Sequence, residues 1–286
     1  MRRFLIFKGN MRKIEYLQRT EQGTGVYGPT IFADLTREEF KKHYLGLRPP
    51  KEGYMRPKPI ARIPDVQLPV EFDWREHKAV TEIKNQGLCG SCWAFSVIGN
   101  IEGQWAIKNK QLLSLSEQEL VDCDKYDSGC NGGWFDSAFR AIEELGGVET
   151  EMDYPYDGDK ETCRFNSSEA RVKISSSVNI SSDETDMAKW LYTNGPITVA
   201  INANAMQFYI GGVSHPLKFL CNPSIDALDH GVLIVGYGVH NYPIYHKTLP
   251  YWIVKNSWGE NWGLQVSRYS DYSHLIRRLY FLFSKV

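Results

Sequence analysis

One thiol of this chain is placed where it can act as a nucleophile. Cys92 lies in the run QGLCGSCWAF at residues 86–95, where a glycine-rich loop gives way to residues that favour a helix. A thiol attacks as the thiolate, and the unpaired N–H groups and dipole of a first helical turn stabilise that anion. Gln86 supplies an amide side chain six residues earlier. The motif therefore predicts covalent catalysis by Cys92.

A cysteine nucleophile needs a base, and the base needs a group that orients it. Of the seven histidines, His230 is the candidate base because it begins an apolar run in the second half of the chain. Asn256 follows a second such run, and its carbonyl oxygen can accept a hydrogen bond from the imidazole, with Trp258 keeping water off that bond. The Gln86 amide and the Cys92 backbone N–H can together stabilise the oxyanion of a tetrahedral intermediate.

The pair Cys89-x-x-Cys92 has another interpretation, as a metal or thioredoxin-type pair. The chain has no second CxxC pair at zinc spacing, so we expect no metal and no other cofactor. The remaining histidines are interpreted as structural; they are His43, His77, His215, His240, His246 and His274.

Length and composition bound the class of protein. The 286 residues are 42% hydrophobic and 23% charged, as in a soluble globular chain of one large domain or two lobes. The net charge of −1 gives no reason to expect a nucleic-acid partner. No apolar run approaches the roughly 18–20 residues of a membrane span, so we expect no membrane partner.

The chain divides into three blocks. Residues 1–47 show apolar residues at helical spacing and a capping-box sequence at 36–39, which predict two helices. Residues 48–69 hold six of the 13 prolines and predict an extended linker. Residues 70–286 carry most of the glycine, tryptophan and cysteine.

The third block changes character along its length. Its first half predicts helices, one over 92–107 and one opened by a second capping box at 116–119. Its second half predicts strands over 197–201, 232–235 and 251–254, where β-branched and aromatic residues dominate. A helical half followed by a sheet half suggests an α+β fold of two lobes with a cleft between them.

These residues resemble the papain family of cysteine peptidases. The run CGSCW at 89–93 is the nucleophile signature of that family. His230 follows Cys92 by 138 residues, within the family's window of about 130–150, and Asn256 follows by 164, slightly beyond it. The resemblance extends from Phe4 to about Gly263, and it implies a papain-like fold with a helical left lobe and a sheet or barrel right lobe.

The resemblance implies that residues 1–47 are a partial inhibitory pro-region. Its helix motif is matched by Arg3, Phe7, Asn10, Ile14 and Gln18, and residues 28–34 resemble the short segment that follows. Such a pro-region folds on the catalytic domain and threads the cleft backwards, as an intramolecular inhibitor. Cleavage near 63–68, inside the linker, would release it. Gln18 and residues 206–209 look most like the cathepsin F group.

The resemblance also assigns roles around the cleft. It implies that Gly132 and Gly133 bind the substrate backbone in extended form, although these glycines alone could merely form a turn. Trp134, Ala200 and Leu228 align with the pocket for the second residue on the acyl side of the scissile bond. Core packing is an alternative role for these three residues. Their apolar nature predicts a bulky hydrophobic residue in that pocket. Asp229 and Trp258 complete the set of substrate-binding residues.

The six cysteines and two glycosylation sequons, at Asn166 and Asn179, point to an oxidising compartment. The resemblance implies disulfides Cys89–Cys130 and Cys123–Cys163, which leaves Cys221 as an odd thiol. It implies a lysosomal or secreted protease, with the signal peptide missing from this sequence through truncation of the pro-region helix. It also implies a monomer with protein and peptide substrates and cystatin-type inhibitors.

The tail at residues 264–286 departs from the family pattern, and no cysteine follows Cys221. We expect an altered tail that exposes a sheet edge and the floor of the second-residue pocket. This leaves a second hypothesis, a catalytically impaired variant that acts only through its pro-region as a binder or inhibitor. A transglutaminase-like acyl transferase shares the Cys–His chemistry but gains no support from the pro-region or the glycine pair.

Overall fold

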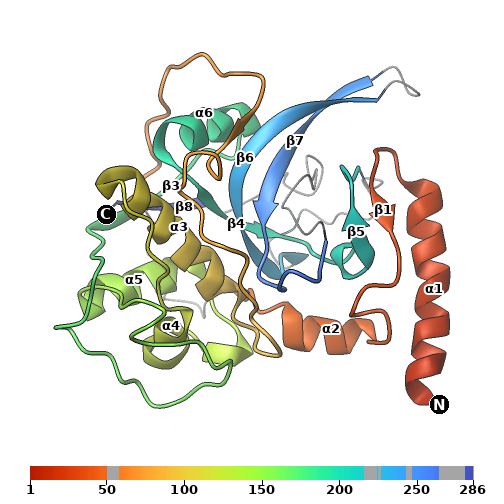
Figure 1. Ribbon diagram of the computed structural model, residues 1–286, viewed down its shortest axis with the longest axis horizontal. Coiled ribbons are helices and arrows are strands. Elements are labelled where there is room, and N and C mark those ends of the chain that lie inside the picture. Colours follow the sequence, from red (N-terminus) through yellow and green to blue (C-terminus); the bar gives the residue numbers. More distant parts are fainter. Residues whose placement is uncertain (50–57, 216–223, 225–226, 243–246, 264–280, 286) are drawn as a thin grey trace.

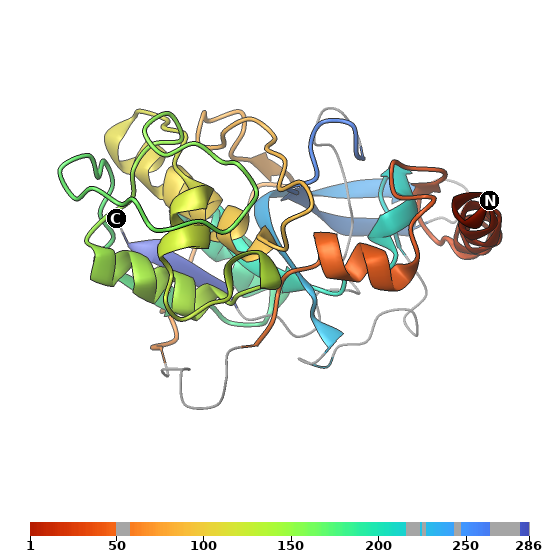
Figure 2. The same ribbon diagram turned by 90° about the horizontal axis from the view of Figure 1, so that it is seen from below.

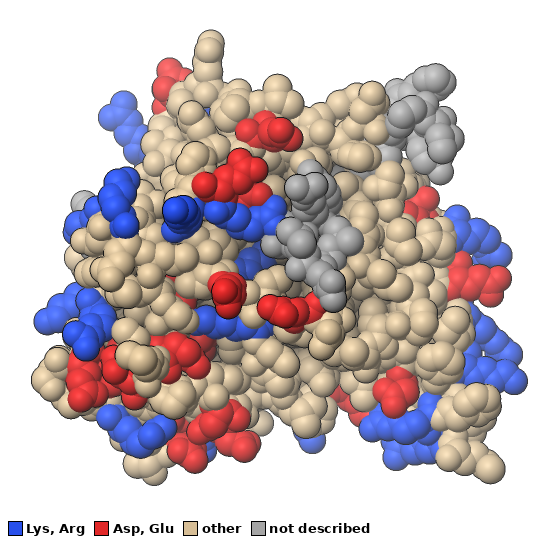
Figure 3. Space-filling model, viewed as in Figure 1, with Lys and Arg blue, Asp and Glu red and all other residues tan. Residues whose placement is uncertain are grey.

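The computed structural model describes residues 1–49, 58–215, 224, 227–242, 247–263 and 281–285. A helical lobe and a sheet lobe lie side by side, and an N-terminal segment packs against the sheet lobe, with its first helix at the far end of the molecule (Figures 1 and 2). The expected α+β architecture is thus confirmed. Within the described residues, no helix has the length and apolar character that a membrane crossing needs. Acidic and basic side chains are interspersed on the face in Figure 3.

The N-terminal segment contains both predicted helices, α1 (Arg2–Thr20) and α2 (Arg37–Tyr44), with the short strand β1 (Val26–Tyr27) between them. The capping box at the start of α2 forms as predicted: Thr36 Oγ1 accepts from Glu39 N, and the Glu39 carboxylate accepts from Thr36 N. The apolar stripe of α1 is only partly used. Ile14 is buried, whereas Phe4 is 64% exposed, because α1 contacts the rest of the protein along a narrow face.

The helical lobe is built from α3 (Cys92–Asn109), α4 (Glu117–Cys123), the 3₁₀ turn η1 (Gly129–Asn131) and α5 (Phe135–Leu145). The second capping box forms only in half. Ser116 Oγ accepts from Glu119 N as predicted, but the Glu119 carboxylate accepts from Glu149 N. The expectation of a reciprocal box was therefore wrong, because a tertiary partner takes the carboxylate.

The sheet lobe contains β2 (Phe72–Asp73), β3 (Ser176–Asn179), β4 (Ile197–Ile201), β6 (His230–Tyr242), β7 (Lys247–Lys255) and β8 (Phe281–Lys285). The strand order is β2-β6-β4-β8-β3, and β7 pairs with β6. The predicted strands are confirmed, and β6 and β7 extend beyond them as a long antiparallel ribbon. Helix α6 (Glu184–Asn194), the turn η2 (Met206–Phe208) and β5 (Tyr209–Gly211) complete the lobe, and β5 pairs with β1.

The tail contributes a strand, which the sequence did not predict. In β8, Phe281 and Leu282 pair with Val199 and Thr198 of β4, and the strand also pairs along β3. β8 lies between β4 and β3, whereas β7 pairs with β6 alone among the described strands, so the open edge expected in this sheet stays a prediction. Residues 264–280 and Cys221 lie outside the described residues.

Both expected disulfides form in the helical lobe. Cys89 bonds to Cys130 and Cys123 bonds to Cys163, with Cα separations of 4.5 Å and 4.7 Å. The first bond fixes the loop before α3 to η1, and the second fixes the end of α4 to the loop after Tyr156. Cys92 is the free cysteine of the described residues.

Candidate active site

Cys92 is the first residue of α3, as its loop-to-helix context predicted. The side chain is fully buried, and its Sγ accepts hydrogen bonds from the backbone N–H groups of Gly231 at 3.4 Å and Gly46 at 3.3 Å. Burial raises the pKa of the thiol to about 11, although these N–H groups oppose the shift. In this form Cys92 is therefore a neutral thiol.

His230 and Asn256 come from the ribbon in the sheet lobe. His230 begins β6, Asn256 follows β7, and the pairing of Leu233 with Lys255 aligns these two ends. The His230 Nε2 and Asn256 Oδ1 atoms lie 2.7 Å apart, in a buried hydrogen bond. The Trp258 ring stacks on the imidazole with its centroid 4.6 Å away.

The other ring nitrogen of His230 is available for proton transfer. Nδ1 is buried and has no hydrogen-bond partner among the described residues. The next residue, Gly231, donates to Cys92 Sγ, so the start of β6 lies directly beside the thiol. Burial lowers the pKa of His230 to about 4, and the bond to Asn256 opposes this shift. The imidazole is thus neutral in this form, like the thiol.

Gln86 lies at the predicted position beside the nucleophile loop and is fully buried. Its Nε2 donates to the carbonyl oxygens of Cys89 at 2.8 Å and Tyr44 at 3.3 Å. Its Oε1 accepts from Ser257 Oγ at 2.7 Å, which fixes which end of the amide faces the cleft. Trp258 Nε1 also donates to Tyr44 O, at 3.4 Å. The N-terminal segment thus places the Tyr44 carbonyl on Gln86, one of the two groups expected to donate to an oxyanion.

Gly132 and Gly133 contact the backbone of the N-terminal segment. Gly133 N donates to Gly46 O and Gly133 O accepts from Arg48 N, each at 3.0 Å, and Leu47 pairs with Gly133 in a parallel bridge. Gly132 has a φ of +113°, and a Cβ there would lie 2.6 Å from Gly46 O. An extended backbone therefore runs along the glycine pair, in the way expected for a substrate backbone.

Gly46 is the point at which the segment crosses Cys92, and it is not among the residues predicted from the sequence. A Cβ at this position would lie 1.7 Å from the carbonyl oxygen of Gly90, so no side chain fits. Its N–H reaches Cys92 Sγ because the two backbones touch here. The signal available in the sequence was a glycine between two apolar residues, Leu45 and Leu47, just after a helix.

The residues expected to form the second-residue pocket are buried in the apolar core that this segment also joins. Trp134, Ala200 and Leu228 belong to one apolar cluster with Leu45 and Leu47, and each is at most 3% exposed. The Asp229 carbonyl oxygen accepts from Leu47 N at 3.1 Å. Its carboxylate accepts from Ala203 N at 2.9 Å, and burial raises its pKa.

An aromatic cluster and one amide anchor the segment over the cleft. The rings of Phe32 and Phe40 lie edge-on to Trp258, with centroids 5.4 Å and 5.3 Å away. Gln207, in the turn η2, donates to the carbonyl oxygens of Phe32 and Leu35 at 3.1 Å. Trp258 therefore contacts both His230 and the segment that covers the cleft.

The two glycosylation sequons differ in their surroundings. Asn166 is exposed, whereas Asn179 is half-buried in β3 and pairs with Leu282 of β8.

Among the described residues, no cluster of three metal-ligating side chains forms.

Comparison with known proteins adds family information to this geometry. A model described as papain family cysteine protease matches residues 68–273, and one described as cathepsin propeptide inhibitor domain matches residues 1–40. The chain is 53% identical over 266 residues to cathepsin F of Drosophila melanogaster and 50% identical over 261 residues to cathepsin F of Mus musculus. These alignments cover 92% and 91% of this chain but 43% and 54% of the relatives, so the chain spans about half their length.

Solved structures give the same fold. The digestive procathepsin L2 proteinase from Tenebrio molitor larval midgut has a TM-score of 0.86 at 32% identity, with 100% of this chain and 92% of that chain covered. The recombinant stem bromelain precursor has a TM-score of 0.84 at 34% identity, with 100% and 91% covered. Both are precursor forms, in keeping with the covered cleft of this chain.

Proposed function

Because this chain belongs to the papain family of cysteine proteases, we propose that it is the zymogen of a cysteine endopeptidase that uses Cys92, His230 and Asn256. The observation that carries the proposal is the meeting of the two lobes at one thiol. Cys92 Sγ accepts from Gly231 N, and the adjacent imidazole is held by Asn256 at 2.7 Å with its other nitrogen free of hydrogen bonds to described residues.

In the proposed reaction, His230 takes the proton of Cys92 and the thiolate attacks the carbonyl carbon of a peptide bond. The Gln86 amide and the Cys92 backbone N–H stabilise the oxyanion. The imidazolium then protonates the leaving amine, which leaves a thioester on Cys92. Water, deprotonated by His230, attacks that thioester, and the released acid frees the thiolate for the next cycle. Asn256 holds the imidazole in one orientation throughout.

Residues 1–47 act in this proposal as the inhibitor of the same chain. The Tyr44 carbonyl oxygen accepts from the Gln86 amide, and the Gly46 N–H donates to Cys92 Sγ. The backbone of Gly46 and of Arg48, the first linker residue, forms hydrogen bonds with Gly133. We place the linker at residues 48–69 and the catalytic domain at 70–286, with maturation cleavage near residues 63–68. Removal of the segment would expose the thiol, the donors and the glycine pair together.

The burial of Leu45 and Leu47 with Trp134, Ala200 and Leu228 supports a preference for a bulky hydrophobic residue at the second subsite. Asp229 offers its backbone carbonyl to the ligand backbone, as it does to Leu47. We further propose a monomeric lysosomal or secreted glycoprotein that acts on proteins and peptides and is inhibited by cystatin-type proteins. The exposure of Asn166 makes it the better glycan acceptor of the two sequons.

The proposal is tested by titration of the matured protein with a thiol alkylator. We expect one equivalent to label Cys92, located by peptide mapping, and to abolish peptide hydrolysis, and we expect Cys92→Ala to lose turnover and the label at position 92. Cys221→Ser is the matched control and should keep both. Peptide hydrolysis that persists in matured Cys92→Ala would contradict the assignment.

A further inference from the structure

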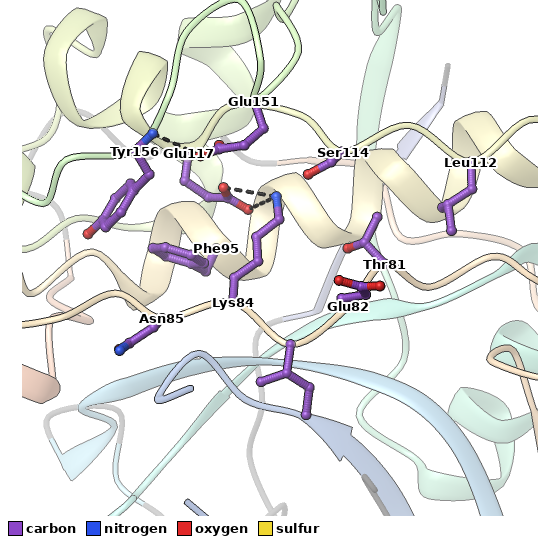
Figure 4. Close-up of a pocket in the computed structure, with 11 residues that line it drawn as sticks. Thr81, Glu82, Lys84, Asn85, Phe95, Leu112, Ser114, Glu117, Glu151 and Tyr156 are labelled. Atoms are coloured by element: carbon purple, nitrogen blue, oxygen red, sulfur yellow. Dashed lines mark hydrogen bonds and ion pairs between the residues drawn. The ribbon is translucent and has the colours of Figure 1, made fainter. Parts of the chain in front are cut away.

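Two acidic side chains of the helical lobe are stabilised in different ways. The Glu117 carboxylate accepts from the Lys84 ammonium, which lies 2.7 Å and 3.0 Å from its two oxygens (Figure 4). The Asp127 carboxyl group instead meets another carboxyl group, that of Asp124, and the two side chains form a hydrogen bond with each other. Because a carboxylate has no proton to donate, this contact needs one proton that the two groups share.

One oxygen of each carboxyl group in this pair accepts hydrogen bonds from nearby donors. Asp124 Oδ1 accepts from Tyr126 N at 2.7 Å and from Asp127 N at 3.2 Å. Asp127 Oδ1 accepts from Trp134 N and from Ser137 Oγ, each at 3.0 Å. The Oδ2 atom of each aspartate is buried and meets no N–H or O–H donor among the described residues. The shared proton therefore belongs between the two Oδ2 atoms.

Asp127 holds the peptide unit that carries the carbonyl of Gly133. The Trp134 N–H and the Gly133 carbonyl belong to the same planar peptide unit and point in opposite directions. Asp127 Oδ1 accepts from that N–H, and Gly133 O accepts from Arg48 N, each at 3.0 Å. The backbone in the cleft and the Asp127 carboxyl group therefore bind opposite sides of one rigid unit. An acceptor on the N–H also makes the carbonyl a stronger acceptor.

Asp127 also packs directly against the glycine pair. A Cβ at Gly133 would lie 2.8 Å from Asp127 Cγ and 2.6 Å from the Trp93 ring. Ser128 N donates to Gly132 O at 2.9 Å, so the loop that carries Asp127 fixes the first glycine as well. A displacement of the Asp127 carboxyl group would therefore displace the carbonyl of Gly133.

The groups around the pair favour the form with one shared proton. Burial, together with the charge of Asp124, raises the pKa of Asp127 to about 9. Burial also raises the pKa of Asp124, whereas the hydrogen bond with Asp127 and the Lys160 ammonium oppose that shift. From α5, the neutral Ser137 hydroxyl faces the pair. Loss of the proton would place two carboxylates in contact, and their repulsion would draw Asp127 away from Trp134 N.

We propose that Asp127 is a positioning residue for substrate binding. With the proton that it shares with Asp124, it orients the Gly133 carbonyl, which receives a backbone N–H of the peptide substrate. It acts through the peptide unit that joins Gly133 to Trp134 and touches no reacting atom. The proposal deepens the proposed function, and its effect on substrate rests on that function. Its effect on the peptide unit does not, because Arg48 N occupies the same carbonyl in the full chain.

The first experiment measures amide hydrogen exchange at pH 7 in the full chain carrying Cys92→Ala. Asp127→Ala removes the acceptor, so exchange at Trp134 N and Arg48 N should be faster by about tenfold, the worth of one hydrogen bond. Asp127→Asn keeps an acceptor for Trp134 N and supplies an N–H for Asp124. It should therefore exchange like the parent.

The matched control is Asp159→Ala, which removes an exposed acid of the same lobe and should exchange like the parent. Equal exchange in Asp127→Ala and the parent would overturn the positioning role. Exchange as fast in Asp127→Asn as in Asp127→Ala would also overturn it, because an amide can make both hydrogen bonds. These outcomes require no peptidase activity, so they are separate from a failure of the proposed function.

The second experiment measures kcat and KM of the matured enzyme against pH with a peptide substrate. Asp127→Ala should raise KM by about tenfold while kcat stays within about twofold, because the Gly133 carbonyl binds substrate and transition state alike. In the parent, KM should rise as the pH passes about 9. Asp127→Asn and Asp124→Asn should show no such rise, since an amide keeps its protons there. A fall in kcat at constant KM, or the same alkaline rise in all variants, would overturn the proposal.

Discussion

The two lobes of this protein hold their reacting groups in different ways. The helical lobe presents Cys92 at the start of α3, and two disulfides that close 41 and 40 residues of chain fix the surrounding loops. In the described part of the sheet lobe no disulfide forms, and the register of β6 with β7 sets His230 against Asn256. Cys92 is thus fixed by local sequence and covalent bonds, and His230 by long-range strand pairing.

The largest effect on activity should follow from removal of the His230 side chain, which the sheet lobe supplies. His230→Ala should lower kcat/KM of the matured enzyme by about 10⁴-fold, since both proton transfers lose their carrier. The control is His240→Ala, further along the same strand, which should leave kcat/KM within about twofold. Steady-state hydrolysis of a peptide substrate measures both variants. Equal losses would mean that β6 acts structurally and that His230 is not the base.

A second test concerns the ionisation of Cys92 and His230, one residue from each lobe. Burial under the pro-region raises the pKa of Cys92 to about 11 and lowers that of His230 to about 4, because a dry site disfavours both charged forms. Maturation rehydrates the site, so the thiol pKa should fall and the imidazole pKa should rise. The rate of alkylation by iodoacetamide at pH 7 should then increase by at least about 10³-fold.

The pH profile of that alkylation distinguishes ionisation from simple access. In the full chain the rate should keep rising with pH beyond 9, as a thiol of high pKa deprotonates. In the matured protein the rate should already be near its plateau at pH 7. Parallel profiles that differ only in height would mean that the pro-region blocks access without changing the pKa values.

The comparison also explains what the sequence could predict. The helix at Cys92, the cap at Thr36 and the strand Ile197–Ile201 follow from local patterns, and the structure places them as expected. The catalytic pair needed more, because no local signal aligns His230 with Asn256. The adjacent apolar runs and the family spacing suggested both residues, but the 2.7 Å contact depends on the pairing of β6 with β7.

The elements that the sequence did not predict depend on tertiary partners. The Glu119 carboxylate accepts from Glu149 N instead of closing a capping box, and β8 lies between β4 and β3. Gly46 has no pattern of its own, because its role comes from the approach of the Gly90 backbone.

The third prediction removes a covalent constraint from the helical lobe. The double substitution Cys123→Ser and Cys163→Ser should lower the free energy of unfolding by about 4 kcal/mol, from the entropy of a 40-residue loop in the unfolded chain. Urea unfolding, followed by fluorescence and circular dichroism, measures the change. An unaltered midpoint would show that packing alone holds this lobe, as it does the described sheet lobe.

The fourth prediction concerns the donor that joins the lobes. Gln86→Ala should lower kcat by about 10²-fold with little change in KM, because the amide acts on the oxyanion and not on the bound substrate. Steady-state kinetics of the matured enzyme separate the two constants. A rise in KM at unchanged kcat would assign Gln86 to ground-state binding.

The smallest effect should come from Ser257, which reaches Gln86 from the sheet lobe. Its hydroxyl donates to Gln86 Oε1 at 2.7 Å, and its own N–H donates to Asn256 Oδ1 at 2.8 Å. Ser257→Ala should lower kcat by about tenfold or less, the worth of one neutral hydrogen bond. Because this hydroxyl acts through the amide, the double variant with Ser257→Ala and Gln86→Ala should lose no more kcat than Gln86→Ala alone. Independent losses would instead show that each lobe contributes its own group and that the bridge between them has no role in catalysis.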